Sequence, residues 1–315
     1  MKYLFLIFLG IFMTFILVIG IMIVVPPPKS IAKLESISDP FRTVDFSKMP
    51  DIQYYMARDG SKLAYHEYPN KLAKQIVVLV HGSSGSSRQM HPLAEYLQKQ
   101  GMTVYSLDIR GHGDSGRKGD IQYIGQLEDD MEDFVNQVLK HQEATLVGFS
   151  LGGGFVLRFA GSERQTLFSR YILLSPYMGY NSPTLKPNNG GWAETSYPRF
   201  IGILLLGPIG EKVFGNLPVI TYAINPENQH QVSQNSFRLL RNFGPGLDYK
   251  SVIASIKQPL KVIIGENDEL FNAQAFPPLF KEASAKVIIV PETGHITLTT
   301  SLSGISAVAK GVIED

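Results

Sequence analysis

A five-residue motif in the middle of the chain, residues 148–152 (Gly-Phe-Ser-Leu-Gly), limits the fold more than any other feature. It follows a short apolar run at 145–148 and leads into residues 151–160, which favour a helix. A serine on a sharp strand-to-helix turn has a strained backbone, and glycines two positions away leave room for the bend. The motif arises by chance in about one chain in ten of this length. It therefore predicts an exposed nucleophile, Ser150, only if the surrounding sequence supports it.

Strand-like runs alternate with helical patterns on both sides of this motif. The run 75–80 is apolar after Gln75 and mostly β-branched, which is typical of a strand buried on both faces. The alternation predicts an α/β fold: a mostly parallel sheet with helices on both faces. We expect strands at 52–56, 62–68, 75–80, 103–107, 145–148, 171–174, 260–264 and 286–290, and helices at 88–99, 121–141, 151–160, 273–284 and 298–313.

The alternation stops at residues 177–255, which are rich in Pro, Gly, Asn and aromatic residues and hold the only tryptophan, Trp192. The segment includes one very apolar piece, residues 201–209. A long insertion of this kind is more often functional than disordered. We expect a cap, or lid, made mostly of short helices, over the carboxyl ends of the strands. A second independent domain is the alternative, but the segment has no core pattern of its own.

The amino-terminal stretch, residues 3–25, carries no charge. As a helix it would be roughly 34 Å long, enough to cross the core of a bilayer. Three prolines at 26–28 end it. A cleaved signal peptide would have a shorter apolar region, and a buried helix of a soluble protein would have a polar face. The sequence predicts an uncleaved transmembrane signal-anchor at 1–28, a linker at 29–49, and an α/β core at 50–176 and 256–315.

Charges near this helix are almost balanced, with Lys2 on one side and Lys29 and Lys33 on the other. We expect a single-pass membrane protein with its catalytic domain on the extracytoplasmic side. The whole chain has 29 basic and 28 acidic residues, which does not indicate a nucleic-acid partner. It contains no cysteine, which excludes disulfides, thiolate metal sites and a cysteine nucleophile. The sequence predicts neither a cofactor nor a metal.

Each of the last two predicted strands is followed by a polar cluster where a ligand site would lie in such a sheet. An acidic turn that contains Asp268 follows the first, and His295 follows the second. A serine nucleophile needs a neighbouring base, and that base needs an acid to hold its tautomer and stabilise its charged form. We therefore predict Ser150, His295 and Asp268 as catalytic residues. Glu266 and Glu269 are the alternative acids.

Two backbone amides are predicted to stabilise an oxyanion. The amide of Leu151 opens the helix after the nucleophile, and that of Ser83 follows the first parallel strand. The nearby side chains of His81, Asp108 and His112 are expected to fix loops instead of taking part in chemistry.

With these motifs the chain resembles the α/β-hydrolase superfamily and, within it, the monoacylglycerol lipase and lysophospholipase branch, also called serine aminopeptidase-like. The resemblance covers roughly residues 54–315. It implies the same catalytic and oxyanion residues, and a cap between the sixth and seventh strands. The oxyanion loop departs from the pattern, and no substrate-binding residue is predicted because the cap matches no member closely. The resemblance rests on residues 81–82, 108–115, 148–153, 174–176, 265–268 and 294–295.

The sequence thus predicts a membrane-anchored serine hydrolase of a carboxylic ester. The apolar cap piece and the anchor favour a lipid-like substrate, such as a lysophospholipid or a monoacylglycerol. Other chemistry on the same fold remains open, namely a thioesterase, an amidase or peptidase, or a C–C hydrolase. A non-catalytic binding protein is the alternative from a different class.

Overall fold

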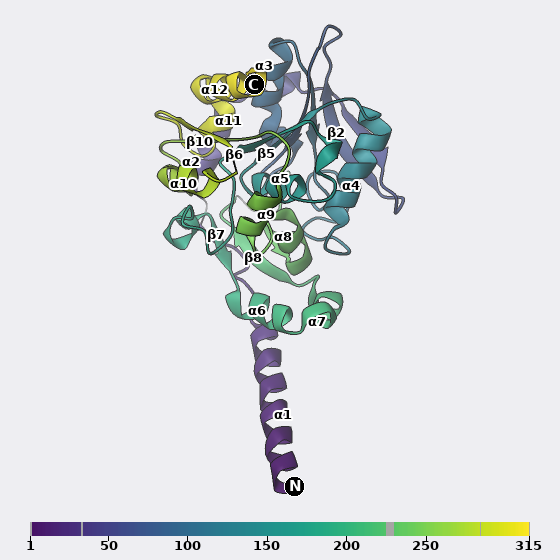
Figure 1. The fold of residues 1–315 in the computed structure, drawn as a ribbon, viewed down its shortest axis with the longest axis vertical. Coiled ribbons are helices and arrows are strands. Elements are labelled where there is room, and N and C mark those ends of the chain that lie inside the picture. The colour runs from purple at the N-terminus through teal and green to yellow at the C-terminus, as the bar shows by residue number, and fades with distance from the viewer. Residues whose placement is uncertain (1, 33, 225–229, 284, 315) are drawn as a thin grey trace.

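The computed structural model describes residues 2–32, 34–224, 230–283 and 285–314. A sheet with helices on both faces forms the upper part of the molecule, a cap lies beneath it, and one long helix extends from the cap (Figure 1). The mostly parallel α/β sheet predicted from the sequence is confirmed.

The main sheet has eight strands in the order β1-β2-β4-β3-β5-β6-β10-β11. The pairs β1–β2 and β2–β4 are antiparallel, and all the other pairs are parallel. The carboxyl ends of six parallel strands therefore meet at one edge, the edge that the cap covers. The strands are β1 (Ile52–Met56), β2 (Lys62–Tyr68), β3 (Ile76–Val80), β4 (Thr103–Leu107), β5 (Thr145–Phe149), β6 (Arg170–Leu174), β10 (Leu260–Gly265) and β11 (Lys286–Val290).

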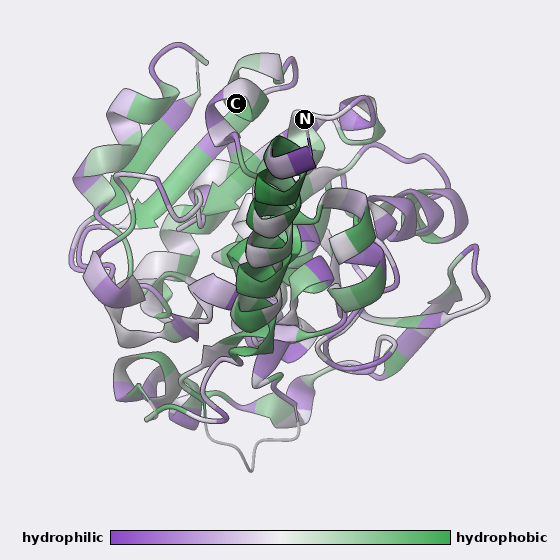
Figure 2. Cartoon of the chain, turned by 90° about the horizontal axis from the view of Figure 1, so that it is seen from below, coloured by the Kyte–Doolittle hydropathy of each residue, from purple (hydrophilic) through white to green (hydrophobic). Residues whose placement is uncertain are grey.

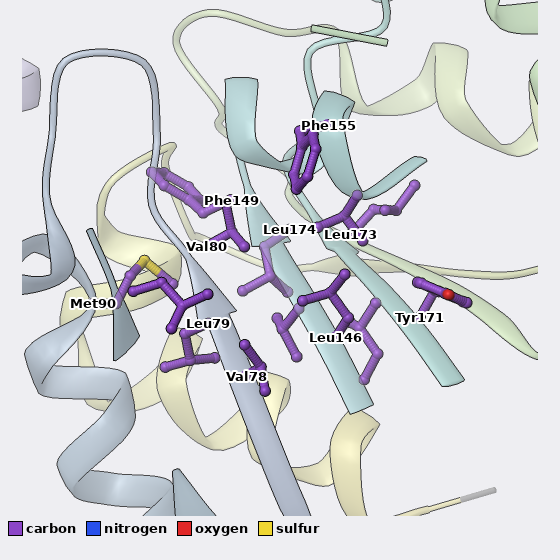
Figure 3. Packing of buried hydrophobic residues seen from close by; sticks show 14 of the residues in the cluster. Val78, Leu79, Val80, Met90, Leu146, Phe149, Phe155, Tyr171, Leu173 and Leu174 are labelled. Atoms are coloured by element: carbon purple, nitrogen blue, oxygen red, sulfur yellow. The ribbon is translucent and has the colours of Figure 1, made fainter. Parts of the chain in front are cut away.

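The central strands are buried on both faces, as their apolar runs predict. Side chains of β3, β5 and β6 pack against Phe155 of the following helix and against Met90 (Figure 3). Val78, Leu146 and Leu173 are each 0% exposed. Burying one such side chain contributes about 1.5–3 kcal/mol, so these strands form a rigid base for the edge above them.

Three of the expected helices are shorter than predicted. The helix at 121–141 begins only at Gln126, because Gly125 has a left-handed φ of 108°. The helix at 273–284 is limited by its prolines to a 3-10 turn and a short α10; its expected end at Ser284 lies outside the described residues. The last helix breaks at Ser301, whose hydroxyl caps the second half. The helices of the core are α3 (His91–Lys99), α4 (Gln126–Phe134), α5 (Leu151–Ala160), α10 (Phe276–Phe280), α11 (Thr297–Thr300) and α12 (Leu302–Ile313).

The cap segment contains a small sheet as well as helices, so the expectation of mostly short helices was incomplete. Its three antiparallel strands, in the order β7-β8-β9, include two of only three residues, which is too short for an alternating pattern to emerge. The elements are β7 (Ala193–Thr195), α6 (Tyr197–Leu205), α7 (Gly207–Phe214), β8 (Pro218–Tyr222), β9 (Gln234–Ser236), α8 (Phe237–Phe243) and α9 (Tyr249–Ser255).

The long helix α1 (Lys2–Val24) is apolar along almost its whole length (Figure 2). It is the one candidate membrane span among the described helices, by length and composition. The segment expected to be a linker, residues 29–49, is packed: it forms α2 (Glu35–Ser38) and two 3-10 turns, and Ile37 is 5% exposed within the main core.

Candidate active site

Ser150 occupies the sharp turn between β5 and α5. Its backbone has φ 55° and ψ −120°, a region that costs a non-glycine residue about 1–3 kcal/mol. A Cβ on Gly152 would collide with the carbonyl oxygen of His81, and one on Gly148 with the backbone of Gly152. The turn is also tied to β6, because the Ser150 amide donates to the Leu174 carbonyl oxygen at 2.9 Å. The two glycines of the motif are thus required by close backbone packing.

The structure brings together the three side chains predicted from far apart in the sequence. His295 Nε2 lies 3.0 Å from Ser150 Oγ, and His295 Nδ1 lies 2.7 Å from Asp268 Oδ2. All three residues are buried, with 6%, 2% and 0% of Ser150, His295 and Asp268 exposed. The rings of Phe149 and Phe271 lie 4.8 and 5.2 Å from the imidazole and limit its rotation. In this arrangement Nδ1–H donates to the carboxylate and Nε2 faces the hydroxyl.

Asp268 is held as an oriented anion. Its other oxygen, Oδ1, accepts hydrogen bonds from the amides of Leu270 and Phe271, each at 2.9 Å. Burial by itself would raise the pKa of the Asp268 carboxyl, but His295 and the Phe271 amide hold that pKa below its ordinary value. The carboxylate therefore stays charged and points at the imidazole.

The two alternative acids bind backbone amides near this site. Glu269 Oε2 accepts from the amide of His295 at 2.6 Å, and Glu266 Oε2 accepts from the amide of Glu292 at 3.2 Å. Asp268, in contrast, contacts the ring itself. Glu266 and Glu269 thus brace the loop that carries His295.

The two predicted oxyanion residues, Ser83 and Leu151, line the same cavity as Ser150. Within the described part of the chain, neither of their amides has a hydrogen-bond partner. Leu151 is the first residue of α5, where helix amides are unpaired and the helix dipole favours negative charge. Both amides are therefore available to a developing oxyanion.

Buried polar side chains fix the loop that carries Ser83. His81 accepts from the Ile109 amide through Nε2 and donates to the Gly82 carbonyl through Nδ1. His112 Nε2 donates to the Ser83 carbonyl oxygen at 2.8 Å. Burial lowers the pKa of His81 to about 4; burial and the neighbouring His81 lower that of His112 to about 3.

The carboxylate of Asp108 also holds this loop, because it accepts from the amides of Ser87 at 2.7 Å and Asp114 at 2.8 Å. Neutral histidines and a doubly bonded carboxylate thus make the Ser83 loop a fixed part of the site.

Trp192 is a site residue whose role sequence reasoning missed. Its Nε1–H donates to Ser83 Oγ at 2.9 Å, and its ring stacks on that of Tyr222 with centroids 5.8 Å apart. On another side of the site, Lys186 Nζ donates to the Asp268 carbonyl oxygen at 2.5 Å. The cap is therefore bonded directly to the Ser83 loop and the Asp268 loop. Trp192 lies in an irregular stretch, and nothing in its local sequence identifies a partner more than 100 positions away.

A cavity of about 260 Å³ extends from Ser150 to helix α6 of the cap. Its walls are mostly apolar and aromatic, and they include Leu185, Trp192, Phe200, Leu204, Ile220, Leu240, Leu247 and Leu270. Among the lining residues within the described part, Arg241 is the one with a charged side chain. Its Nε is buried without a hydrogen-bond partner, and burial lowers the pKa of the guanidinium. No local sequence pattern predicts that Arg241 lines the cavity, because the cavity walls are formed by many separate segments of the chain.

Within the described residues, no group of three or more His, Asp or Glu side chains is placed to hold a metal ion.

Comparisons with known proteins agree with this geometry. The sequence profile of the family described as serine aminopeptidase, S33, matches residues 71–299. The chain is 26% identical over 228 residues to a monoacylglycerol lipase of Mycolicibacterium smegmatis, covering 67% of this chain and 76% of that protein. It is 29% identical over 150 residues to a monoglyceride lipase of Rattus norvegicus, covering 44% of this chain and 47% of the rat protein.

Solved structures show the same fold. A soluble variant of monoglyceride lipase from Saccharomyces cerevisiae, in complex with a substrate analog, aligns with a TM-score of 0.65 at 18% identity, over 85% of this chain and 94% of that one. The monoacylglycerol lipase of Paleococcus ferrophilus aligns with a TM-score of 0.60 at 19% identity, over 80% and 97%.

Proposed function

The chain belongs to the serine aminopeptidase S33 family, in the monoacylglycerol lipase branch of the α/β-hydrolases, and we propose that it is a membrane-anchored serine hydrolase that cleaves a lipid-like carboxylic ester. In this proposal residues 1–28 anchor the chain and residues 29–49 join the anchor to the core. Residues 50–176 and 256–315 form the hydrolytic core, and residues 177–255 form the cap.

The reaction follows from the relay of hydrogen bonds. Ser150 Oγ attacks the acyl carbon while His295 Nε2 takes its proton, and Asp268 stabilises the imidazolium. The amides of Ser83 and Leu151 stabilise the oxyanion. The imidazolium then protonates the leaving alcohol, which leaves an acyl-enzyme on Ser150. Water, deprotonated by His295, attacks this acyl group and releases the carboxylic acid.

The single observation that carries the proposal is the continuous contact from Ser150 Oγ through His295 to Asp268, at 3.0 and 2.7 Å. A binding protein on the same fold has no need of a buried, oriented acid behind a histidine that faces a strained serine. The same three residues would also serve a thioesterase, an amidase or a C–C hydrolase, so the choice of an ester depends on the relatives.

A lipid substrate is supported by the cavity. Its walls are apolar, and its volume of about 260 Å³ lies just below the usual range for ligand pockets, about 300–1,000 Å³. A narrow apolar cavity suits one acyl chain. The names of the relatives point to the ester of a single acyl chain with glycerol.

Arg241 favours a lysophospholipid over a neutral monoacylglycerol. Arg241 lines the cavity, and its buried Nε–H has no hydrogen-bond partner within the described part of the chain. A buried donor that lacks a partner costs about 1–3 kcal/mol, and the phosphate of a lysophospholipid would supply the missing acceptor. The monoacylglycerol remains the second candidate, because the relatives carry that name.

Anchoring in a membrane is part of the proposal. Helix α1 is long enough to cross a bilayer and only 11% of its most apolar window is buried by the rest of the chain. We place the catalytic domain on the extracytoplasmic side, with a two-residue tail on the other side. A protease added to intact cells should then digest the catalytic domain, and full protection would reverse this orientation.

The test is hydrolysis of p-nitrophenyl esters of increasing chain length by the full chain in lipid nanodiscs. We expect kcat/KM to rise from the acetyl ester to esters of eight or more carbons. Ser150→Ala in the same nanodiscs is the control for turnover by other groups. Activity confined to acetyl and butyryl esters would remove the lipid substrate from the proposal, while amide or thioester turnover alone would replace the ester.

A further inference from the structure

The carboxyl end of α1 is bonded to the cap. Arg199 of α6 donates from Nε to the Ile23 carbonyl oxygen at 2.8 Å and from Nη2 to that of Val24 at 3.4 Å. Ser196 Oγ donates to the Val25 carbonyl oxygen at 2.7 Å. The last carbonyls of a helix have no partners within it, and a cation there also interacts favourably with the helix dipole. Two side chains of the cap thus complete the end of α1.

The same end of α1 is packed as tightly as a core helix. Ile19 and Ile23 are 2% and 5% exposed, and they share a cluster with Ile203, Val219 and Phe237 of the cap. Gly202 allows this approach, since a Cβ there would lie only 3.0 Å from the Ile23 side chain. Bonding and packing together indicate a fixed joint between α1 and the cap.

The length of α1 sets the depth of this joint in a membrane. From Tyr3 to Val18, the part that projects beyond the cap, α1 is about 24 Å long. The hydrocarbon core of a bilayer is about 30 Å thick and needs about 20 helical residues. Twenty residues counted from Tyr3 end at Met22, which lies beside Gly202 of α6. If α1 spans the bilayer, α6 must therefore lie at the edge of the hydrocarbon.

The cap is apolar at this level. Ile201, Leu205, Ile209 and Val213 are 42%, 54%, 70% and 56% exposed. They follow one another at intervals of four on α6 and α7, the two helices that lie where α1 leaves the cap (Figure 1). We call these four residues the α6–α7 surface. Four exposed apolar side chains on two consecutive helices are typical of an interaction site.

The cavity reaches the same helix. Ile201 belongs to the α6–α7 surface and also lines the cavity, as do Tyr197 and Leu204 of α6. We infer that α1 and the cap bind the bilayer as one rigid unit, in which Arg199 fixes the end of α1 and the α6–α7 surface lies in the lipid, so that the cavity receives its ester directly from the bilayer. This inference rests on the proposed anchoring by α1.

The first test measures depth with spin labels. The chain has no cysteine, so single cysteines can be placed in the full chain and labelled with a nitroxide. Labels at Ile209→Cys and Val213→Cys measure the depth of the α6–α7 surface, and a label at Ile11→Cys measures the depth of the anchor. A label at Leu72→Cys, a position that is 89% exposed and outside the cap, is the water-exposed reference. In phosphatidylcholine nanodiscs we expect the first three labels to collide with oxygen and to be shielded from a water-soluble nickel chelate.

The outcomes distinguish a failure of this inference from a failure of the proposed membrane anchoring by α1. A label at Ile11 in lipid with labels at Ile209 and Val213 in water would overturn the inference and leave the anchor intact. A label at Ile11 in water would overturn the anchor and the inference with it.

The second test measures the consequence for turnover. Replacing Leu205, Ile209 and Val213 by serine, outside the cavity wall, should lower turnover of an ester embedded in phosphatidylcholine vesicles by about tenfold. Turnover of soluble p-nitrophenyl butyrate should stay unchanged and reports on folding. Serine replacements at Met56, Leu72 and Leu302, which are exposed elsewhere, form the matched control. Arg199→Leu should have the same selective effect. Unchanged turnover of the embedded ester by the triple variant would overturn the inference.

Discussion

The two walls of the cavity are built in different ways. On the sheet side, Ser150, Asp268 and His295 follow strands β5, β10 and β11, and backbone hydrogen bonds hold each of them. On the cap side, short helices and three-residue strands present apolar side chains around Trp192 and Leu204.

Their stability also differs in origin. The sheet side stands on the main core, where residues such as Val78 and Leu146 are completely buried. The cap has two small clusters, and one of them is completed by Ile19 and Ile23 of α1. In the proposed function, the chemistry depends on a rigid sheet edge, whereas the cap sets selectivity and membrane contact separately.

The largest expected effect is the loss of turnover when the nucleophile on the sheet side of the cavity is removed. Ser150→Ala removes the nucleophile and should lower kcat by about 10⁴-fold or more, because the remaining groups cannot form an acyl-enzyme. The thermal unfolding midpoint should change little, since the backbone strain at this position remains. Turnover of p-nitrophenyl octanoate and a circular dichroism melt check this. More than a few per cent of residual turnover would contradict the role of Ser150.

The next effect distinguishes two neighbouring acids on the sheet side. Asp268→Asn should lower kcat by about 10³–10⁴-fold with little change in KM, because the imidazole loses its tautomer and its charge partner. Glu269→Gln, the matched control, still accepts from the His295 amide and should cost about tenfold at most. Steady-state kinetics of both variants decide the matter. Equal losses would assign the acid function to the pair.

A smaller effect belongs to the cap. Leu204→Trp fills the far end of the cavity and should reduce kcat/KM for dodecanoyl esters by about tenfold, while acetyl esters react as before. Leu205→Trp is the matched control, since Leu205 is 54% exposed and lies outside the cavity wall. A uniform loss at every chain length would show that the cap also shapes the catalytic groups.

The smallest effect concerns Arg241, a charged residue of the cavity wall. Arg241→Leu should lower kcat/KM for a lysophospholipid by about tenfold, the loss of one charge-assisted hydrogen bond. Turnover of a monoacylglycerol should stay the same, because its head group carries no phosphate for the guanidinium to bind. Parallel assays of the two lipids make the measurement. An equal change for both lipids would remove Arg241 from head-group recognition.

The sheet side of the cavity can be predicted from the sequence, because each of its three polar residues follows a strand that has a recognisable apolar pattern. Ser150 has its glycine motif, and Asp268 and His295 each follow an apolar run. Parallel strands end at one edge, so these residues had to lie near one another. The amides of Ser83 and Leu151 follow from the same rule.

The cap side could not be predicted in this detail. The strands β7 and β9 are too short to show a period. The hydrogen bonds of Trp192 to Ser83 and of Arg199 to Ile23 join residues more than 100 positions apart in the chain. Nothing local indicates that residues 29–49 fold onto the core, because their 3-10 turns have no repeating apolar pattern.

The relay from Ser150 to Asp268 is the central claim, and labelling with a fluorophosphonate tests it most directly. Mass spectrometry of the digested full chain locates the adduct, and the labelling rate is compared between the unmodified chain and His295→Ala. We predict one adduct, on Ser150, and a rate that falls by about 10³-fold or more without the imidazole. An adduct on another residue, or an unchanged rate in His295→Ala, would contradict the account.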